Sequence, residues 1–267
     1  MRSGVRWAAA ISAAALTMLA AAAPATARLR WSGCGDVEAE CAALPVPLDR
    51  SGAVPGAVRL RVARYSPPSR RPTLLYLSGG PGGAGVQEFS DVLFEVGDLS
   101  KRFDLVSYDQ RGTGGSGVLR CRALERDARL RSTAAGEDCA GRLGARRAFY
   151  TTRDSVEDIE DVRKALGVEK LTLFGISYGT KLALAYARVH PEHVERIALD
   201  SVLEPDDADA FGREPYQAMA PTLAALCPAS CRGVTADPAG DLARLADRLR
   251  AAPLHGTTYG PRGRRHA

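Results

Sequence analysis

Apolar and charged side chains alternate along residues 57–65, the pattern of a β-strand with one exposed face. Residues 73–77 are wholly apolar, as in a strand buried inside a sheet, and further short strands are predicted at 103–108, 170–174 and 194–199. Helical segments separate these strands, so that helices and strands alternate from residue 73 to 200. This order predicts an α/β protein with a mostly parallel sheet and crossover helices.

Two of the predicted helices carry clear core faces. The first comprises Val156, Ile159, Val162 and Leu166, and the second comprises Leu182, Ala185, Tyr186 and Val189. We expect Asp154 or Ser155 to cap the first helix, with Asp158 three residues after Ser155 in a capping box. Gly167 should end the first helix and Pro191 the second.

The segments outside this alternation follow different patterns. Residues 28–56 are rich in Pro, Gly and Ala and are expected to form an irregular lead-in that two cysteines cross-link. Residues 211–226 and 241–252 predict helices. No strand is expected after residue 200, because residues 260–267 show no core-forming pattern.

The first 27 residues have the features of a secretory signal peptide. Arg2 and Arg6 precede an apolar run over 7–23, and Ala25-Thr26-Ala27 is a small-x-small cleavage site. The alternative is a membrane anchor, but a run of this length is marginal for spanning a bilayer. We therefore expect export, cleavage after Ala27 and no stable membrane insertion of the mature chain.

The amino-acid composition and net charge limit the kinds of molecule that the protein is expected to bind. The chain is 45% hydrophobic and 25% charged, as in ordinary globular proteins. Its formal net charge of +5 falls to +3 when Arg2 and Arg6 leave with the leader, so the basic balance is mild and argues against nucleic acid. No pattern calls for a metal or a cofactor, and none is expected.

All six cysteines lie in the predicted exported part, where an even count favours disulfides. Pairing between near neighbours is the simplest of the possible connectivities: Cys34 with Cys41, Cys121 with Cys139, and Cys227 with Cys231. A zinc site is the alternative for the last pair. It is disfavoured because no second Cys or His pair stands at ligand spacing.

A G-x-S-x-G sequence, Gly175-Ile176-Ser177-Tyr178-Gly179, lies between the strand predicted at 170–174 and the helix after it. In α/β-hydrolases this sequence forms a sharp strand-to-helix turn that exposes a nucleophilic serine above the sheet. The plain alternative is a crossover turn without chemistry. Since strand, turn and helix follow in the required order, we interpret Ser177 as the nucleophile.

The glycine-rich loop at residues 78–85 has two interpretations. Gly80, Gly82 and Gly85 match the G-x-G-x-x-G fingerprint of dinucleotide sites, yet Pro81 removes a backbone N–H where a pyrophosphate needs a donor. The other interpretation is an oxyanion loop, in which glycines let backbone N–H groups approach the reacting carbonyl. We favour the oxyanion loop because the serine turn downstream requires one.

Three motifs in order resemble the proline iminopeptidase and tripeptidyl aminopeptidase branch of the α/β-hydrolases, over about residues 31–260. They are Gly79-Gly80-Pro81-Gly82, the stretch from Asp109 to Ser116 (DQRGTGGS), and Gly175-Ile176-Ser177-Tyr178-Gly179. The resemblance is closer to the secreted tripeptidyl aminopeptidases. It implies a serine exopeptidase that releases short N-terminal peptides, with Ser177 as nucleophile and Gly80 and Tyr178 giving the oxyanion N–H groups.

A serine nucleophile needs a base, and the base needs an orienting acid. His190 and His193 end the nucleophile helix about 20 Å away and are expected on the surface. His255 and His266 follow in the right order, but no predicted strand precedes either. Asp200 ends the next strand, and we interpret it as structural rather than as the acid.

The resemblance also implies a longer protein, whose acid and histidine follow further strands and a helical lid. We therefore divide the chain into a signal peptide (1–27), an N-terminal part of the hydrolase core (28–203) and an incomplete lid region (204–267). The expected substrate is a peptide or small ester, and this chain is expected to be inactive or impaired. A secreted lipase or esterase on the same fold, and a non-catalytic fragment, stay open.

Overall fold

The structure is a computed structural model that describes residues 29–65, 69, 71–96, 98–126, 133–205, 213–254, 257–260 and 263–266. The expected signal peptide lies outside these residues. The chain divides into two compact units, Met1–Pro205 and Asp206–Ala267, which are described separately below. None of the helices among the described residues has the length and apolarity needed to cross a bilayer.

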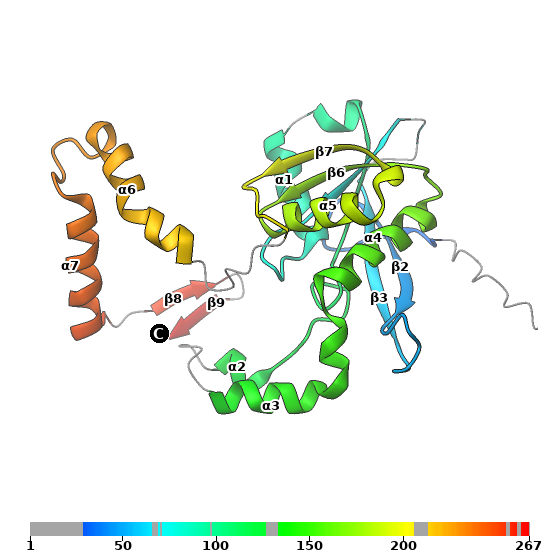
Figure 1. The fold of residues 1–267 in the computed structure, drawn as a ribbon, viewed down its shortest axis with the longest axis horizontal. Coiled ribbons are helices and arrows are strands. Elements are labelled where there is room, and N and C mark those ends of the chain that lie inside the picture. The colour runs from blue at the N-terminus through cyan, green and yellow to red at the C-terminus, as the bar shows by residue number, and fades with distance from the viewer. Residues whose placement is uncertain are drawn as a thin grey trace, which may run out of the picture. The chain divides into compact units, whose positions relative to one another are not determined.

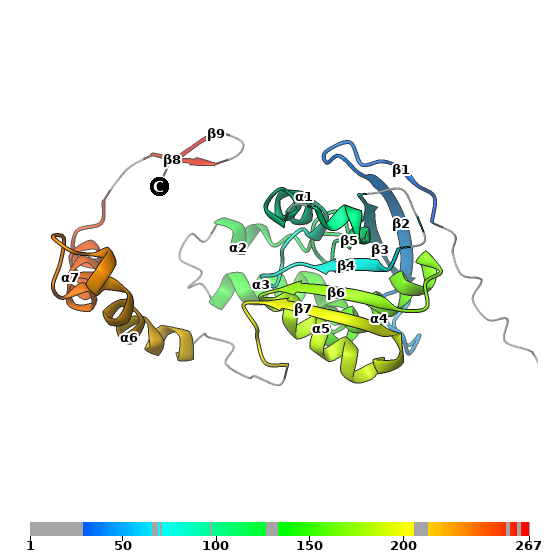
Figure 2. The ribbon, with the colours of Figure 1, turned by 90° about the horizontal axis from the view of Figure 1, so that it is seen from above.

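The first unit (Figure 1) is built on a seven-stranded mixed sheet with the order β1-β2-β3-β5-β4-β6-β7, and all seven strands are labelled in Figure 2. Its strands are β1 (Ser32–Gly33), β2 (Glu40–Pro47), β3 (Ala57–Arg64), β4 (Thr73–Leu77), β5 (Asp104–Tyr108), β6 (Leu171–Ile176) and β7 (Val194–Asp200). Strands β4, β5, β6 and β7 run parallel, whereas β1, β2 and β3 form an antiparallel edge. The predicted α/β sheet with crossover helices is thus confirmed.

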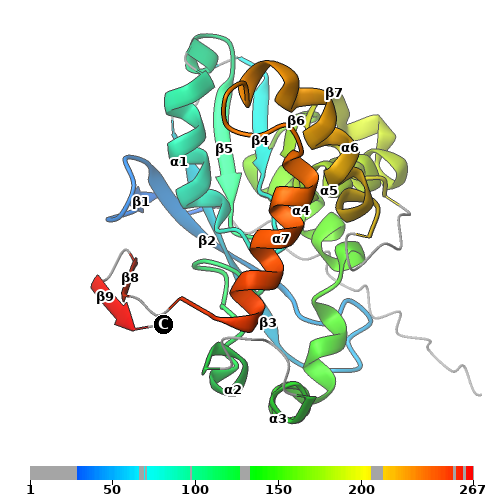
Figure 3. The ribbon, with the colours of Figure 1, turned by 90° about the vertical axis from the view of Figure 1, so that its left-hand side faces the viewer.

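Helices cover both faces of this sheet. Helix α1 (Gly85–Val96) lies on one face, and α4 (Thr152–Leu166) and α5 (Tyr178–Val189) lie on the other (Figure 2). Figure 3 shows α1 beside β5 and β4. All five residues of β4 and of β5 are buried, which is why these strands lack polar alternation.

The two faces of the sheet belong to two hydrophobic clusters. The α4/α5 face includes Leu75, Ile159 and Tyr186, all fully buried, and the α1 face includes Tyr76 and Phe89, whose rings stack at 4.6 Å. On α5 the predicted core face holds at Leu182 and Tyr186, whereas Val189 is 54% exposed. Val189 is the last helical residue, so the helix ends as it leaves the core.

Strand β2 corrects the prediction that residues 28–56 are irregular. Ala42, Leu44 and Val46 alternate inward along it and are buried. The two prolines that disguised this alternation, Pro45 and Pro47, lie where β1 no longer pairs with β2, so their missing N–H groups interrupt no ladder on that side. An edge strand accepts proline for this reason, and the sequence pattern alone concealed it.

The N-terminus of α4 corrects a second prediction. Thr151, rather than Asp154 or Ser155, is the N-cap, and its side chain accepts a hydrogen bond from the Asp154 N–H. Asp158 is fully buried within the helix and takes no part in a capping box. Gly167 ends the helix in the left-handed region, as predicted, with φ 71°.

Among the described residues, the first unit also contains five further helical segments and two disulfides, and a third disulfide lies in the second unit. The helical segments are η1 (Asp98–Lys101), α2 (Arg122–Arg126), α3 (Thr133–Leu143), η2 (Gly144–Phe149) and η3 (Pro191–His193). The disulfides join Cys34 to Cys41, Cys121 to Cys139 and Cys227 to Cys231, which are the predicted near-neighbour pairs. Pairing of the last two cysteines removes the zinc alternative.

The second unit contains two helices, α6 (Arg213–Ser230) and α7 (Pro238–Ala251), close to the predicted ranges. A hairpin of β8 (Thr257–Gly260) and β9 (Gly263–His266) follows, contrary to the expectation that no strand comes after residue 200. Its two-residue connection is of the length that favours a hairpin. Such a local pairing needs no core pattern, so hydrophobic periodicity did not reveal it.

Candidate active site

Ser177 occupies the turn between β6 and α5 with a strained backbone. Its φ of 53° and ψ of −118° are rarely adopted by a residue that carries a side chain, and such strain of about 1–3 kcal/mol is characteristic of functional turns. Its N–H donates to the Asp200 carbonyl of β7 at 2.9 Å. The turn thus continues the sheet by one hydrogen bond before the chain enters the helix.

The two glycines that flank Ser177 allow two backbones to cross. A Cβ on Gly175 would lie 2.5 Å from the Gly179 carbonyl oxygen, and a Cβ on Gly179 would overlap the Leu77 carbonyl oxygen at the end of β4. No side chain fits at either place. The G-x-S-x-G spacing is therefore a packing requirement of this turn as well as a sequence pattern.

The glycine loop after β4 lies against Ser177. A Cβ on Gly79 would stand 3.2 Å from the Ser177 Cβ, which is a tight contact, and 3.8 Å from its Oγ, so Gly79 lies directly beside the serine side chain. Gly80 and Gly82 have φ values of 112° and 114°, a region that favours glycine. Gly79 rather than Gly80 makes the contact, and the role of Gly80 as an N–H donor stays a prediction.

Asp109 and Gln110 hold this loop from the end of β5. The Asp109 carboxylate accepts from the Val86 N–H at 2.9 Å and the Gly115 N–H at 2.6 Å, and Gln110 donates to the Ser78 carbonyl at 3.0 Å. Burial raises the pKa of Asp109 in spite of these two donors. The second glycine motif thus supports the first, a role that its sequence did not indicate.

Glu88 on α1 is a further support that sequence reasoning missed. Its carboxylate accepts from the Tyr76 hydroxyl at 3.0 Å and from the Ser78 hydroxyl. The hydrogen bond with Ser78 joins α1 to the first residue of the glycine loop. No signal in the sequence indicated this role, because Glu88 is one of several polar residues in α1.

On the other side of Ser177, two hydroxyl groups secure the start of α5. The Tyr178 hydroxyl hydrogen-bonds the Thr152 hydroxyl of α4 at 2.9 Å, and burial raises the pKa of Tyr178. Thr180 Oγ1 donates to the Ser177 carbonyl at 2.6 Å and accepts from the Leu203 N–H at 2.8 Å. The segment after β7 is thereby tied to the serine turn.

Strand β4, the glycine loop and the serine turn all lie within a segment that matches a known protein family. The sequence profile described as "alpha/beta hydrolase fold" matches residues 72–236, more than half of the 267-residue chain. The chain belongs to the α/β hydrolase fold family.

Three curated relatives carry peptidase names. The chain is 30% identical to a tripeptidyl aminopeptidase of Streptomyces coelicolor, across 70% of this chain and 40% of the relative. It is 28% identical to the serine protease Hip1 of Mycobacterium tuberculosis (67% and 38%) and 36% identical to a proline iminopeptidase of Neisseria meningitidis (48% and 32%). The chain thus spans 40% or less of the length of these relatives.

Two solved structures are similar to parts of this chain. A proline iminopeptidase-related protein from Thermus thermophilus shares 26% identity over 60% of this chain and 44% of that chain, with a TM-score of 0.39. An epoxide hydrolase from Vigna radiata shares 18% identity over 72% and 47%, with a TM-score of 0.44.

A buried ion pair anchors the Asp109 loop of this α/β-hydrolase to α4. Arg111 donates through Nε and Nη2 to the two carboxylate oxygens of Asp158, at 2.7 and 2.6 Å, and through Nη1 to the Phe149 carbonyl. Arg50 donates to the same carboxylate at 2.7 Å. Burial raises the pKa of Asp158, and the two arginines oppose that shift.

The histidines proposed from sequence stand as follows. His190 and His193 lie at the far end of α5, a helix of 12 residues or about 18 Å, so neither reaches Ser177. Their side chains are 17% and 25% exposed, so both lie partly exposed at the surface, as expected, while each also packs against neighbouring side chains. His255 and the side chain of His266 lie outside the described residues. Asp200 ends β7, and its carboxylate accepts from the Ser201 hydroxyl.

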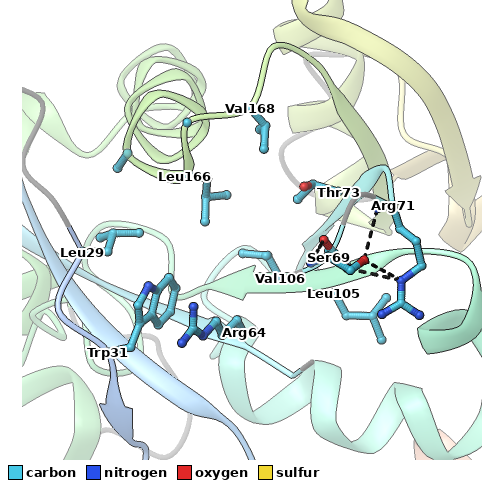
Figure 4. Close-up of a pocket in the computed structure, with 13 residues that line it drawn as sticks. Leu29, Trp31, Arg64, Ser69, Arg71, Thr73, Leu105, Val106, Leu166 and Val168 are labelled. Carbon is cyan, nitrogen blue, oxygen red and sulfur yellow. Dashed lines mark hydrogen bonds and ion pairs between the residues drawn. The ribbon is translucent and has the colours of Figure 1, made fainter. Parts of the chain in front are cut away.

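A cavity of about 500 Å³ opens at the opposite end of the sheet (Figure 4). Thr73 and Asp104, which begin β4 and β5, line it together with Trp31 and Arg64, whose guanidinium lies 4.5 Å from the Trp31 ring centroid. Ligands of open α/β sheets bind at the carboxyl ends of the strands. The cavity is at the amino ends and is therefore separate from the site at Ser177.

Proposed function

We propose that this chain is the N-terminal part of an exported serine exopeptidase that releases short peptides from the amino termini of its substrates. The observation that carries the proposal is the strained Ser177 turn with the Gly79 loop packed beside its hydroxyl. The peptidase names of the relatives support the substrate class. The apolar leader with its small-x-small site and the three disulfides support export.

In this mechanism the Ser177 oxygen attacks the scissile carbonyl, and backbone N–H groups stabilise the oxyanion that forms. Tyr178 is the first residue of α5, so its N–H points out of a helix N-terminus, where the helix dipole favours negative charge. A glycine N–H of the 79–80 pair is the second donor. Asp109, Gln110 and Glu88 are positioning residues that hold the glycine loop.

The proton of Ser177 needs a base, and His190 and His193 are too distant to accept it. We propose that neither His255 nor His266 is this base, and that the base and its acid belong to the part of the relatives' length that this chain does not cover. Loss of a triad partner reduces turnover by roughly a millionfold. This chain alone should therefore hydrolyse tripeptidyl substrates very slowly.

A fluorophosphonate probe and a substrate panel test the proposal. Residues 28–267 and a version extended with the C-terminal part of a relative are compared, each with Ser177→Ala and with the control Ser201→Ala. We expect the extended protein to be labelled at Ser177 and to cleave tripeptidyl amides faster than short esters. Labelling that survives Ser177→Ala would overturn the nucleophile, and faster cleavage of esters would favour a lipase or esterase.

A further inference from the structure

Two imidazole rings stack at the end of α5 that is remote from Ser177. His190 is the C-cap of α5 and His193 ends η3; their ring centroids lie 6.1 Å apart with 22° between the planes. The His193 N–H donates to the His190 carbonyl at 3.1 Å. A 3₁₀ turn places side chains i and i+3 above one another, so the backbone itself brings these rings together.

Two carboxylates of α4 face these rings. Glu157 and Glu160 are three residues apart and therefore share one side of the helix, which packs against α5 (Figure 1). Glu157 Oε1 lies 3.5 Å from His190 Nε2, and Glu160 Oε2 lies 3.3 Å from His193 Nδ1. Glu160 is buried, with 4% of its side chain exposed.

Within the part of the chain that the structure describes, the imidazole nitrogens that face the carboxylates have no hydrogen-bond partner. His190 Nε2 and His193 Nδ1 are both buried atoms without a donor or acceptor in hydrogen-bonding geometry. Leaving such atoms unpaired costs about 1–3 kcal/mol each, so a native site needs a reason to hold them there. A nitrogen of a neutral imidazole is also the commonest protein ligand of metal ions.

We propose that Glu160, His190 and His193 bind one divalent transition-metal ion of the Zn²⁺ type, with Glu157 and Glu192 as further oxygen donors, each 3.5 Å from one of the two histidines. One ligand atom from each of the three residues lies within 4.8 Å of the others. Tetrahedral zinc with bonds of 2.0–2.1 Å places its ligand atoms about 3.3 Å apart, so a small side-chain adjustment closes the site. Two imidazoles with a carboxylate select zinc over Ca²⁺ or Mg²⁺, which prefer oxygen ligands.

The surroundings of Glu160 resemble the outer shell of a metal site. Arg163 donates to both oxygens of Glu160, and the Tyr186 hydroxyl donates to Oε2 at 2.9 Å. These bonds fix the carboxylate, as partners of ligating carboxylates do, and leave it further lone pairs. Arg163 and Lys164 bring two positive charges to this cluster. The carboxylates of Glu157 and of Glu192, the latter 3.5 Å from His193, offset these charges.

The ion would serve structure rather than peptide hydrolysis. It would join α4 to the turn that leads from α5 into β7, about 18 Å along α5 from Ser177. The site therefore stands independently of the proposed peptidase function. The imidazole side chains are 17% and 25% exposed, which gives the ion access from solvent.

The test is titration of the full chain, first stripped with a chelator, with ZnCl₂ in a calorimeter. We expect one Zn²⁺ per chain and a higher melting temperature in its presence. His190→Gln and His193→Gln should each weaken binding at least about tenfold, because the loss of a ligand exceeds the loss of an outer-shell partner. The matched control His266→Gln, in the second unit, should bind as the unaltered chain does.

Circular dichroism shows whether each variant folds, and Co²⁺ gives a readout that requires no variant. Intense visible absorption, typical of four-coordinate Co²⁺, is expected with the unaltered chain and should disappear on addition of Zn²⁺. Absence of Zn²⁺ binding by the unaltered chain would overturn the proposal. So would equal binding by folded His190→Gln, or only the weak absorption of six-coordinate Co²⁺.

Discussion

The carbonyl oxygen of Leu77 occupies the space that a side chain on Gly179 would need. Leu77 ends β4 and Gly179 lies in the first turn of α5, so the helix that follows Ser177 rests directly on the end of the neighbouring strand. This contact sets the height of the serine above the sheet.

Gly179→Ala should destabilise the protein by about 1–3 kcal/mol, because the added methyl group forces β4 and α5 apart. The measurement is urea unfolding followed by circular dichroism. Gly141→Ala is the matched control, since Gly141 lies in helix α3 with open space around its Cβ position, and it should be neutral or stabilising. Equal stability of the two variants would contradict the crossing.

Ser177→Gly should be more stable than Ser177→Ala by about 1 kcal/mol. Both variants lack the hydroxyl, but only glycine adopts φ 53° and ψ −118° without strain. Ala185→Gly, inside α5, provides the control of ordinary helical geometry and should lose about 1 kcal/mol. A Ser177→Gly variant less stable than Ser177→Ala would argue against a strained turn.

Arg111→Lys should cost about 2–4 kcal/mol of unfolding free energy. A lysine ammonium cannot form both parallel bonds to the buried Asp158 carboxylate, which is then left partly unpaired. The control is Arg142→Lys on α3, whose ion pair with Asp138 is exposed and should contribute little. Thermal unfolding of both variants decides; a comparable loss in each would refute the special role of Arg111.

Asp109 should make stability decline as the pH rises through its titration. Burial raises its pKa above the ordinary 3.8, so between 3.8 and the raised value the folded protein keeps a proton that the unfolded chain has released. The free energy of unfolding is therefore reduced in full by the buried Asp109 charge above the raised pKa, and is not reduced by it below pH 3.8. This acid dependence should vanish in Asp109→Asn.

The measurement is urea unfolding of both proteins from pH 3 to 7, compared as a difference that cancels the other carboxyl groups. The stability of the unaltered protein relative to Asp109→Asn should fall with rising pH. A difference that stays constant, or that grows with pH, would show that the two N–H donors outweigh burial.

Local pattern alone was sufficient for the centre of the first unit. The apolar residues of β4 predict a buried strand, and the order of strand, turn and helix around Ser177 predicts the serine turn. Both predictions succeed because a buried strand requires consecutive apolar residues and a tight turn requires glycines close to the serine in the sequence. The three near-neighbour disulfides also follow from short sequence separation. In each case the partners that decide the structure are close together in the chain.

Only the tertiary structure decided features whose partners are distant in the sequence. Pro45 is tolerated in β2 because β1 does not extend that far along β2, and Gly79 contacts Ser177 from the loop that follows β4. Asp109 supports the glycine loop, and His190 is half-buried against α4, through contacts that no sequence window contains. Chain folding creates these neighbours, so the residues that build Ser177's surroundings became visible only in three dimensions.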